Sequence, residues 1–297
     1  MRILVTGGTG LIGSQLVPLL AAQHKLVVLT RNVAMAERVL NHKIELHSSL
    51  AHFDDLNDFD AVINLAGEPI VNKRWSQKKQ VIENSRWQTT ERLVDLINKS
   101  SQPPSVFISG SAIGYYGRQN DEAIDEYSER FNDEYAHRLC KRWEDIALSV
   151  RSDKTRVCIL RTGIVLSANG GALSKMLLPF KMGLGGPIAD GKQYMSWIHI
   201  KDMLNGIDYL LTHSSCAGVY NFTSPNPVTN QSFSKALADN LNRPCFFKTP
   251  AFVLRMAMGE MADLLLFGQR VMPTRLLESG FKFEHAELGE ALRSLRL

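Results

Sequence analysis

Cysteine is scarce in this sequence, and no apolar run is long enough to suggest a membrane span. The four cysteines lie far apart, with neither zinc-site nor redox-pair spacing, which favours free thiols in a reducing compartment. The most apolar late stretch, 251–267, is interrupted by Arg255, Glu260 and Asp263, so we expect no membrane partner. Residues 2–5 already resemble a buried strand; we therefore expect no signal peptide and a cytoplasmic protein.

A basic stripe is also missing. The sequence has 34 lysines and arginines against 30 acidic residues, and both kinds are spread along the chain. This small excess suits an anionic small ligand, whereas a nucleic-acid-binding protein would need clustered basic residues. We therefore expect a small-molecule ligand and no nucleic-acid partner.

Short β-rich runs alternate with longer helical patterns in the first half of the chain. The expected strands are 2–5, 26–30, 61–65, 105–109 and 157–161. Alternation of this kind is typical of a parallel sheet that is covered by helices on both faces and joined by right-handed connections. The sequence therefore predicts an α/β protein with a Rossmann doubly wound parallel sheet.

The local composition changes beyond about residue 165, where glycine and proline become frequent. Residues 165–200 are expected to form a loop-rich substrate segment, and the late helices are expected over 252–267 and 286–295. We predict a dinucleotide-binding domain over 1–222 and a small, mainly helical carboxy-terminal domain over 245–297. This smaller module is expected to cover the mouth of the nucleotide fold.

The strongest motif is Val5-Thr6-Gly7-Gly8-Thr9-Gly10-Leu11-Ile12-Gly13, which follows a strand and opens a helical pattern. Gly7 permits a tight turn, Gly10 lets the backbone approach a pyrophosphate, and Gly13 lets the helix pack closely on the strand. The phosphates are expected to bind the free N–H groups at the positive end of that helix. The residues predicted to bind them are Gly7, Thr9, Gly10, Leu11, Ile12 and Gly13.

The end of the second expected strand indicates which dinucleotide is bound. NAD-binding Rossmann folds place an acidic residue there, but this sequence has Thr30-Arg31-Asn32 and no carboxylate before Glu37. A guanidinium forms paired, charge-assisted hydrogen bonds with a 2′-phosphate, which a carboxylate would repel. Thr30 and Arg31 therefore predict NADP as the cofactor.

These motifs resemble the extended short-chain dehydrogenases/reductases of the NAD-dependent epimerase/dehydratase family. The resemblance rests on the glycine spacing, on Asn64-Leu65-Ala66-Gly67 and on Leu160-Arg161-Thr162-Gly163-Ile164-Val165. More narrowly, several segments resemble the group named epimerase family proteins: Asn64–Pro69, Trp143-Glu144, Met176–Pro187 and Trp197–Ile200. The resemblance covers almost the whole chain and implies a carboxy-terminal domain of unknown function over roughly 248–295.

The resemblance also implies further cofactor contacts. Leu65, Ala66 and Gly67 would present backbone groups beside the adenosine and ribose of the cofactor. Arg86 lies in a helix that is expected to face the cofactor. Val165 follows the end of a strand and would touch the nicotinamide region, since ligands of open α/β sheets bind at the carboxyl ends of strands.

The catalytic pattern of the family is broken in this sequence. The resemblance implies a tyrosine with a lysine four residues later, on the same helix face, so that the phenol can exchange a proton with the substrate. After Tyr135 the position of the lysine holds Leu139, and an alignment on Glu144 places Ala136 and Cys140 at the two positions. Tyr135 stays a catalytic candidate. Its alternative role is packing, because Tyr135, Leu139, Trp143, Ile146 and Val150 recur at helical spacing.

Other candidates lie near the expected nicotinamide position. Ser111 resembles the family's serine and could hydrogen-bond the substrate, or could instead cap backbone. Tyr115 and Tyr116 follow it and could supply a displaced proton donor or stack over the site. His199 is expected to be a hydrogen-bonded structural residue, and Asp202 to cap the helix after it. The acidic residues between 121 and 126 are typical of a solvated loop, and no metal is expected.

Two functions remain open from the sequence. The first is an NADP-dependent oxidoreductase or epimerase that acts on a small polar molecule of sugar or carbonyl type, with a non-standard proton donor. The second is an NADP-binding sensor or scaffold without turnover, which the broken dyad favours. Members of the extended family often pair through a helix bundle, so a homodimer is an open expectation.

Overall fold

The computed structural model describes residues 1–40, 44–69 and 75–297, apart from the side chains of 75–78, 257, 260 and 261. Its internal contacts divide the chain into two compact units, each made of three segments. The first comprises Met1–Ser111, Leu139–Leu160 and Leu204–Val219. The second comprises Ala112–Arg138, Arg161–Met203 and Tyr220–Leu297. These units interleave along the sequence, whereas the predicted boundary between 222 and 245 divides the chain only once; that boundary stays a prediction.

A seven-stranded sheet in the order β11-β7-β5-β4-β1-β2-β3 forms the frame. Its strands are β1 (Arg2–Thr6), β2 (Lys25–Leu29), β3 (Glu45–His47), β4 (Ala61–Asn64), β5 (Val106–Ala112), β7 (Arg156–Thr162) and β11 (Gly218–Phe222). The pairings of β1 with β2 and β4, of β2 with β3 and of β4 with β5 are parallel. The doubly wound α/β class is confirmed, and all five expected strands form. Strands β3 and β11 were not predicted, because their short runs lack a long apolar stretch.

Continuous apolar runs explain why the central strands are buried on both faces. Leu4 is in register with Val27 on β2 and with Val62 on β4, and Val62 is in register with Phe107 on β5. All four are almost completely buried and belong to one cluster. Burying a side chain of this size stabilises the fold by roughly 1.5–3 kcal/mol. This row of side chains therefore makes a large contribution to holding the strands together.

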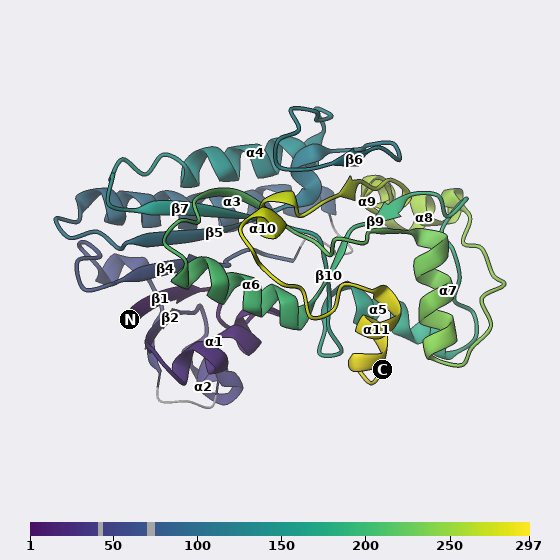
Figure 1. Cartoon of the computed structure of the whole chain (residues 1–297), viewed down its shortest axis with the longest axis horizontal. Coiled ribbons are helices and arrows are strands. Elements are labelled where there is room, and N and C mark those ends of the chain that lie inside the picture. The colour runs from purple at the N-terminus through teal and green to yellow at the C-terminus, as the bar shows by residue number, and fades with distance from the viewer. Residues whose placement is uncertain (41–43, 70–74) are drawn as a thin grey trace. The chain divides into compact units, whose positions relative to one another are not determined.

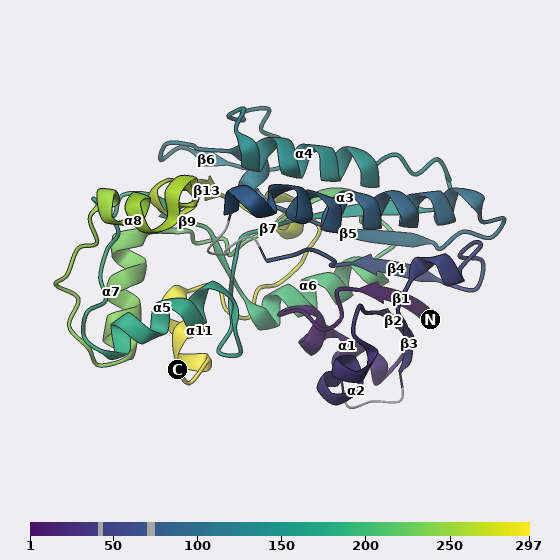
Figure 2. The ribbon, with the colours of Figure 1, turned by 180° about the vertical axis from the view of Figure 1, so that it is seen from behind.

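Helices cover both faces of the sheet within the first unit (Figures 1 and 2). One face carries α3 (Trp75–Lys99) and the part of α4 (Tyr135–Ala147) from Leu139 onward; α3 is in front in Figure 2. The other carries α1 (Gly13–Ala21), α2 (Val33–Leu40) and the later part of α6 (Ile200–Thr212). A short 3-10 turn, η1 (Leu50–His52), precedes β4. This layering places the carboxyl ends of the strands at one edge of the unit.

The second unit consists of short helices, short strands and loops. Its strands pair as β8 (Ile164–Leu166) with β10 (Trp197–His199), β9 (Tyr194–Met195) with β12 (Val228–Thr229), and β6 (Ala123–Ile124) with β13 (Arg270–Val271). Its helices are η2 (Ile113–Tyr116), α5 (Gly171–Lys181), α7 (Asn230–Asn240), α8 (Ala251–Met258), η3 (Gly259–Ala262), α9 (Asp263–Leu266), α10 (Thr274–Glu278) and α11 (Leu288–Ser294). Fully buried Trp197 and Phe233 lie in its main apolar cluster.

The predicted long helix over 252–267 is wrong as a single element. Helix α8 stops at Met258, because Gly259 takes a φ of 59° and ends the helix. The chain then continues through η3 and α9. The expected helix over 286–295 forms as α11. Within the residues that the structure describes, no helix is both long and apolar enough to cross a membrane.

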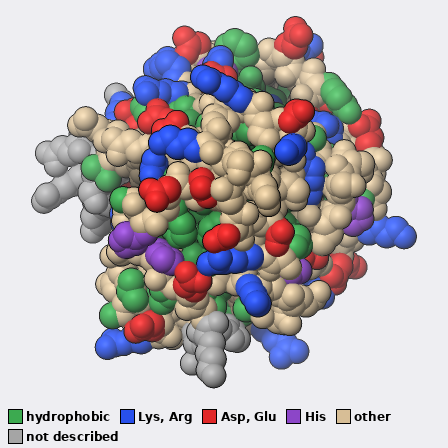
Figure 3. All heavy atoms as spheres, turned by 90° about the vertical axis from the view of Figure 1, so that its left-hand side faces the viewer, with side chains coloured by type: hydrophobic (Ala, Val, Ile, Leu, Met, Phe, Trp, Pro, Cys, Tyr) green, Lys and Arg blue, Asp and Glu red, His purple; other side chains and the backbone are tan. Residues whose placement is uncertain are grey.

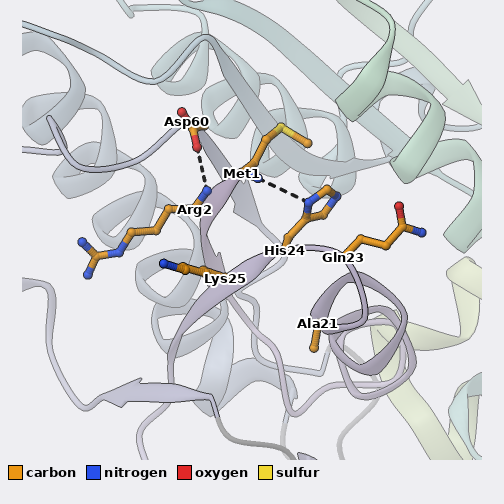
Figure 4. Close-up of a pocket in the computed structure, with 7 residues that line it drawn as sticks. All are labelled: Met1, Arg2, Ala21, Gln23, His24, Lys25 and Asp60. Atoms are coloured by element: carbon orange, nitrogen blue, oxygen red, sulfur yellow. Dashed lines mark hydrogen bonds between the residues drawn. The ribbon is translucent and has the colours of Figure 1, made fainter.

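The amino ends of the strands present a mixed surface. On the side of the molecule seen in Figure 3, basic and acidic side chains are interspersed. A hollow beside the starts of β1 and β2 is lined by Met1, Arg2, Ala21, Gln23, His24, Lys25 and Asp60 (Figure 4). There the Arg2 backbone N–H donates to Asp60 Oδ2 at 2.6 Å. Ligands of open α/β sheets bind at the opposite, carboxyl ends of the strands, so this hollow is not the candidate site.

Candidate functional site

The turn after β1 is compressed against the turn after β4. Gly7 has a φ of 71°, and a Cβ on it would lie 2.4 Å from the carbonyl oxygen of Leu65. A Cβ on Gly13 would lie 2.2 Å from the carbonyl oxygen of Gly7. The Gly10 N–H donates to the same carbonyl at 3.0 Å and closes the turn. Only glycine fits at positions 7 and 13: Gly7 makes the tight turn, and Gly13 lets the start of α1 lie against the backbone of Gly7 and Gly8.

Helix α1 begins with a positive end that no side chain compensates. Its first turn contains no acidic residue, and Ile12 makes no side-chain capping bond. Across the described part of the chain, the N–H groups of Leu11 and Ile12 donate to no protein acceptor. Free amides and the helix dipole together favour an anion at this position.

Arg31 follows β2 and forms an ion pair that was not predicted. Its guanidinium lies 3.1 Å from a carboxylate oxygen of Glu68, which follows β4. The side chain of Arg31 is 85% exposed and that of Glu68 is 22% exposed. Thr30 is buried, and its hydroxyl accepts from the Asn32 N–H at 3.3 Å. No sequence signal pointed to Glu68, because the two charges are 37 residues apart.

Buried polar bonds hold the turn after β4. Asn64 is completely buried; its Oδ1 accepts from the Thr6 hydroxyl at 2.7 Å, and its Nδ2 donates to the Thr90 hydroxyl at 2.9 Å. The Leu65 N–H donates to the Thr6 carbonyl at 3.1 Å. Buried polar groups that are fully paired fix one geometry. Asn64 therefore determines where the backbone of Leu65 and Ala66 lies.

Arg86 supports the same turn from within the protein. It is 8% exposed, and its guanidinium donates to the Glu68 carbonyl at 3.1 Å and the Ile82 carbonyl at 3.0 Å. It also lies over the ring of Trp143, 5.3 Å from the centroid. A Cβ on Gly67 would lie 3.1 Å from this guanidinium, while Gly67 itself is exposed. Arg86 thus braces the backbone of the turn.

Ser111 at the end of β5 donates to a buried carboxylate. Its hydroxyl lies 2.6 Å from Glu144 Oε1, and the two residues are 5% and 3% exposed. Glu144 comes from α4, one position after Trp143. In the segment Trp143-Glu144, the Trp143 ring therefore contacts Arg86 and the Glu144 carboxylate accepts from Ser111. The contact between Glu144 and Ser111 joins residues 33 positions apart and was not predicted.

Tyr115 and Tyr116 belong to the second unit and differ in their surroundings. Tyr116 is completely buried; its hydroxyl lies 3.0 Å from the Asp125 carbonyl, from Asn221 Oδ1 and from an Arg161 nitrogen that donates to it. Burial raises the pKa of Tyr116 to about 12. Tyr115 is half-buried, and the Arg161 guanidinium lies over its ring, 3.4 Å from the centroid.

The tyrosine of α4 lies on a packing face. Tyr135, Ile146 and Val150 are half-buried, and Leu139 and Trp143 are buried. The predicted stripe is therefore confirmed from Tyr135 to Ile146, whereas Val150 lies beyond the end of α4 at Ala147. Tyr135 itself belongs to the second unit, like Val165, which is 8% exposed on β8 and pairs with Ile198 of β10.

His199 and Asp202 hydrogen-bond to the carboxy-terminal segment within the second unit. His199 is 5% exposed; its Nδ1 accepts from the Lys201 N–H at 3.1 Å, and its Nε2 lies 3.1 Å from the Ser294 hydroxyl. This confirms it as a hydrogen-bonded structural residue. The predicted helix cap at Asp202 is wrong, because α6 begins at Ile200 and the carboxylate accepts from the backbone of Glu284 and His285.

The acidic loop is only partly solvated, which corrects the prediction. Asp121 and Glu122 are exposed, but Glu126 accepts from the backbone N–H of Asn221 at 2.8 Å and of Arg275 at 3.3 Å. Burial raises the pKa of Glu126, against these hydrogen bonds. Among the residues with described coordinates, no cluster of histidine, cysteine or acidic side chains could hold a metal ion. All four cysteines lie in this described part, and none forms a disulfide.

Comparison with known protein families identifies the family of this chain. Residues 3–222 match the model of the NAD dependent epimerase/dehydratase family. The chain belongs to this family. Residues 249–295 match a second model, a domain of unknown function.

Relatives of this epimerase family member extend over its whole length. It is 40% identical over 303 residues to the chloroplastic epimerase family protein SDR39U1 homolog of Arabidopsis thaliana, covering 99% of this chain and 86% of that protein. It is 35% identical over 298 residues to the epimerase family protein YfhF of Bacillus subtilis, covering 99% and 98%. The resemblance to epimerase family proteins that the motifs suggested is thereby confirmed.

Solved structures show the same fold for this family member. Human epimerase family protein SDR39U1, crystallised with NADPH, superposes with a TM-score of 0.91 at 36% identity and covers 99% of both chains. UDP-glucuronic acid 4-epimerase from Bacillus cereus superposes with a TM-score of 0.76 at 17% identity, covering 99% of this chain and 98% of that one. At that lower identity the similarity concerns the fold alone.

Acid is expected to destabilise this family member through His199. Burial, reinforced by His285 and Lys201 against Glu284, lowers the pKa of His199 from 6.5 to about 4. Between these two pH values His199 is protonated in the unfolded chain but stays neutral in the folded protein. The free energy of unfolding therefore falls as the pH drops from 6.5 toward 4. The expected loss between about pH 7 and pH 5 is about 2 kcal/mol. Urea unfolding of the wild type at these two pH values measures it.

The matched variant for this prediction is His199→Asn, whose amide oxygen can still accept from the Lys201 N–H. Its stability is expected to fall less between the two pH values than that of the wild type. His213→Gln, at an exposed position, controls for the loss of one histidine. Equal pH dependence in the wild type and His199→Asn would contradict the assignment.

Proposed function

We propose that the protein is an NADP-binding oxidoreductase or epimerase of the extended short-chain dehydrogenase type. Its substrate is a small polar molecule with a sugar-type hydroxyl or a carbonyl group. The observation that carries the proposal is Arg31 at the carboxyl end of β2, beside the free amides of the Gly7–Gly13 turn. The NADPH in the crystal structure of human SDR39U1, 36% identical to this chain, supports the choice of coenzyme. Among bacterial relatives we place the chain beside YfcH, which its motifs resemble.

The proposed coenzyme site uses four groups of residues. The amides of Thr9, Leu11 and Ile12, with the turn set by Gly7, Gly10 and Gly13, bind the pyrophosphate. Thr30 and Arg31 bind the 2′-phosphate. Leu65, Ala66 and Gly67 line the adenosine ribose with backbone groups, and Arg86 acts as a positioning residue that holds their turn. Val165 is proposed to contact the nicotinamide, which accepts or supplies hydride when the coenzyme is bound.

The proposed proton donor is Tyr115. Tyr116 is enclosed by three hydrogen-bond partners and its raised pKa opposes ionisation, so we propose that it is a structural residue. Tyr135 lies on the packing stripe of α4 and keeps the same structural role in this proposal. The guanidinium of Arg161 lies over the Tyr115 ring, and we propose that it takes the place of the lysine that is missing from the family dyad.

Ser111 is proposed to position the substrate. Because its hydroxyl proton is donated to Glu144, its oxygen can only accept, and it suits a substrate hydroxyl group. Glu144 is then a positioning residue that fixes the rotamer of Ser111. Ser111→Ala is expected to weaken substrate binding more than coenzyme binding.

Coenzyme loading and turnover test this function directly. The protein loaded with NADPH is offered panels of sugars, aldehydes and ketones while NADPH absorbance is followed. Tyr115→Phe is expected to lower turnover by at least about 100-fold, in the range of general acid catalysis, with unchanged NADPH affinity. The matched variant Tyr116→Phe removes the neighbouring hydroxyl and is expected to lower stability while Tyr115 still supports turnover.

Two outcomes would contradict the proposal. Equal turnover by the wild type and Tyr115→Phe would exclude Tyr115 as the proton donor. Tight NADPH binding without turnover on any panel would exclude an enzyme for these substrates and favour the sensor or scaffold reading.

A further inference from the structure

The ion pair between Arg31 and Glu68 joins the carboxyl ends of two strands that are not neighbours. In the sheet order β4-β1-β2, Arg31 follows β2 and Glu68 lies just beyond β4, with β1 between them. The Gly7–Gly13 turn rises from the end of β1. The 3.1 Å contact therefore spans the strand that leads into the proposed pyrophosphate site.

Glu68 is held for this contact by its own backbone. Its N–H donates to the Ser85 hydroxyl at 2.9 Å, and its carbonyl accepts from Arg86 at 3.1 Å. The Ser85 hydroxyl in turn donates to the Ile82 carbonyl at 2.8 Å, so this anchor is tied to α3. Both the N–H and the carbonyl of Glu68 are therefore hydrogen-bonded, and its side-chain carboxylate extends to Arg31.

The carboxylate of Glu68 takes the place of the acidic residue that is missing from the end of β2. In NAD-binding Rossmann folds an acidic residue accepts a hydrogen bond from the ribose 2′-hydroxyl, and a 2′-phosphate is repelled by the same charge. The end of β2 has only Arg31, but folding brings Glu68 to the same place. One guanidinium and one carboxylate therefore face the atoms by which NADP and NAD differ.

We infer that Glu68 is a coenzyme-selecting residue: its carboxylate competes with the 2′-phosphate of NADP for Arg31 and accepts a hydrogen bond from the 2′-hydroxyl of NAD. This inference rests on the proposed function, because it concerns the same coenzyme site. Arg31 favours NADP and Glu68 opposes that preference. The protein is consequently less selective for NADP than Arg31 alone would make it.

The experiment measures the dissociation constants of NADP and NAD by calorimetry for the wild type and Glu68→Gln. Glutamine keeps the size of the side chain and removes its charge. The variant is expected to bind NADP about three- to tenfold more tightly, in line with the loss of an exposed ion pair and of one like charge. NAD affinity is expected to stay constant or to fall. The ratio of the two constants therefore moves toward NADP.

Two further variants make the result specific. Glu91→Gln removes one negative charge from an exposed ion pair with Arg142 on the same unit and is expected to leave the ratio unchanged. In an Arg31→Gln background, Glu68→Gln is expected to change NADP affinity less than in the wild type, because the competition for Arg31 is gone.

The outcomes separate this inference from the function on which it rests. A wild type that binds NADP, together with an unchanged or lowered preference in Glu68→Gln, overturns the role of Glu68 and leaves the proposed function standing. A wild type that binds neither NADP nor NAD overturns both.

Discussion

Replacing Gly13 with alanine is expected to lower NADP affinity by at least about 100-fold and to destabilise the protein by about 3 kcal/mol. The added Cβ would lie 2.2 Å from the Gly7 carbonyl oxygen, 2.6 Å from Gly8 Cα and 2.8 Å from Gly8 carbonyl carbon. All three atoms are backbone, so the turn itself must move. The free amides of Leu11 and Ile12 would then point away from the pyrophosphate, and two charge-assisted bonds would be lost. Calorimetry and urea unfolding measure the two effects.

Gly289→Ala is the matched control for this change. Gly289 lies inside α11, where a Cβ would meet only the end of the flexible Arg293 side chain at 3.4 Å. Alanine is the better helix former, so this variant is expected to be as stable as the wild type or more stable, with unchanged NADP affinity. A Gly13→Ala protein with wild-type affinity and stability would show that this turn does not hold the coenzyme.

Periodicity and glycine spacing made the frame of the protein predictable. The apolar runs around Leu4 and Val62 can only be buried in a sheet that is covered on both faces. The positions of Gly7 and Gly13 need a backbone that no other residue allows, and this need is local to a short segment. Such signals lie within a few residues of one another, so the sequence displays them directly.

The charged and polar pairs of the site could not be predicted in this way. Glu68 meets Arg31, and Ser111 meets Glu144, over separations of 37 and 33 residues. Each contact depends on the order of the strands in the sheet, which composition does not contain. The absence of a carboxylate near Arg31 in the sequence was therefore a poor guide to its surroundings in the fold. The half-buried Glu126, which accepts from the distant Asn221 and Arg275 N–H groups, was missed for the same reason.

Neighbouring residues of one type were also indistinguishable in sequence. Tyr115 and Tyr116 are adjacent, but only Tyr116 is enclosed, with Arg161 and Asn221 at its hydroxyl. Arg161 contacts both rings from a distant strand. Their different roles in the proposed function follow from this packing, and no local sequence motif distinguishes the two tyrosines.

Arg31→Asp is expected to reverse the coenzyme preference, with the ratio of NADP to NAD affinity falling by at least about 100-fold. The guanidinium follows the end of β2, and its hydrogen bonds to a 2′-phosphate are worth about 1.5–3 kcal/mol. An aspartate beside Glu68 would repel that phosphate and accept from the 2′-hydroxyl of NAD instead.

The measurement for this reversal is the pair of dissociation constants for NADP and NAD, determined at more than one salt concentration. Because charge repulsion between exposed groups is screened by salt, the loss of NADP affinity is expected to shrink as ionic strength rises. Arg142→Asp, which reverses a charge that pairs with Glu91 on α3, is the matched control and is expected to keep the wild-type ratio. Equal NADP affinity in the wild type and Arg31→Asp would refute the 2′-phosphate site at Arg31.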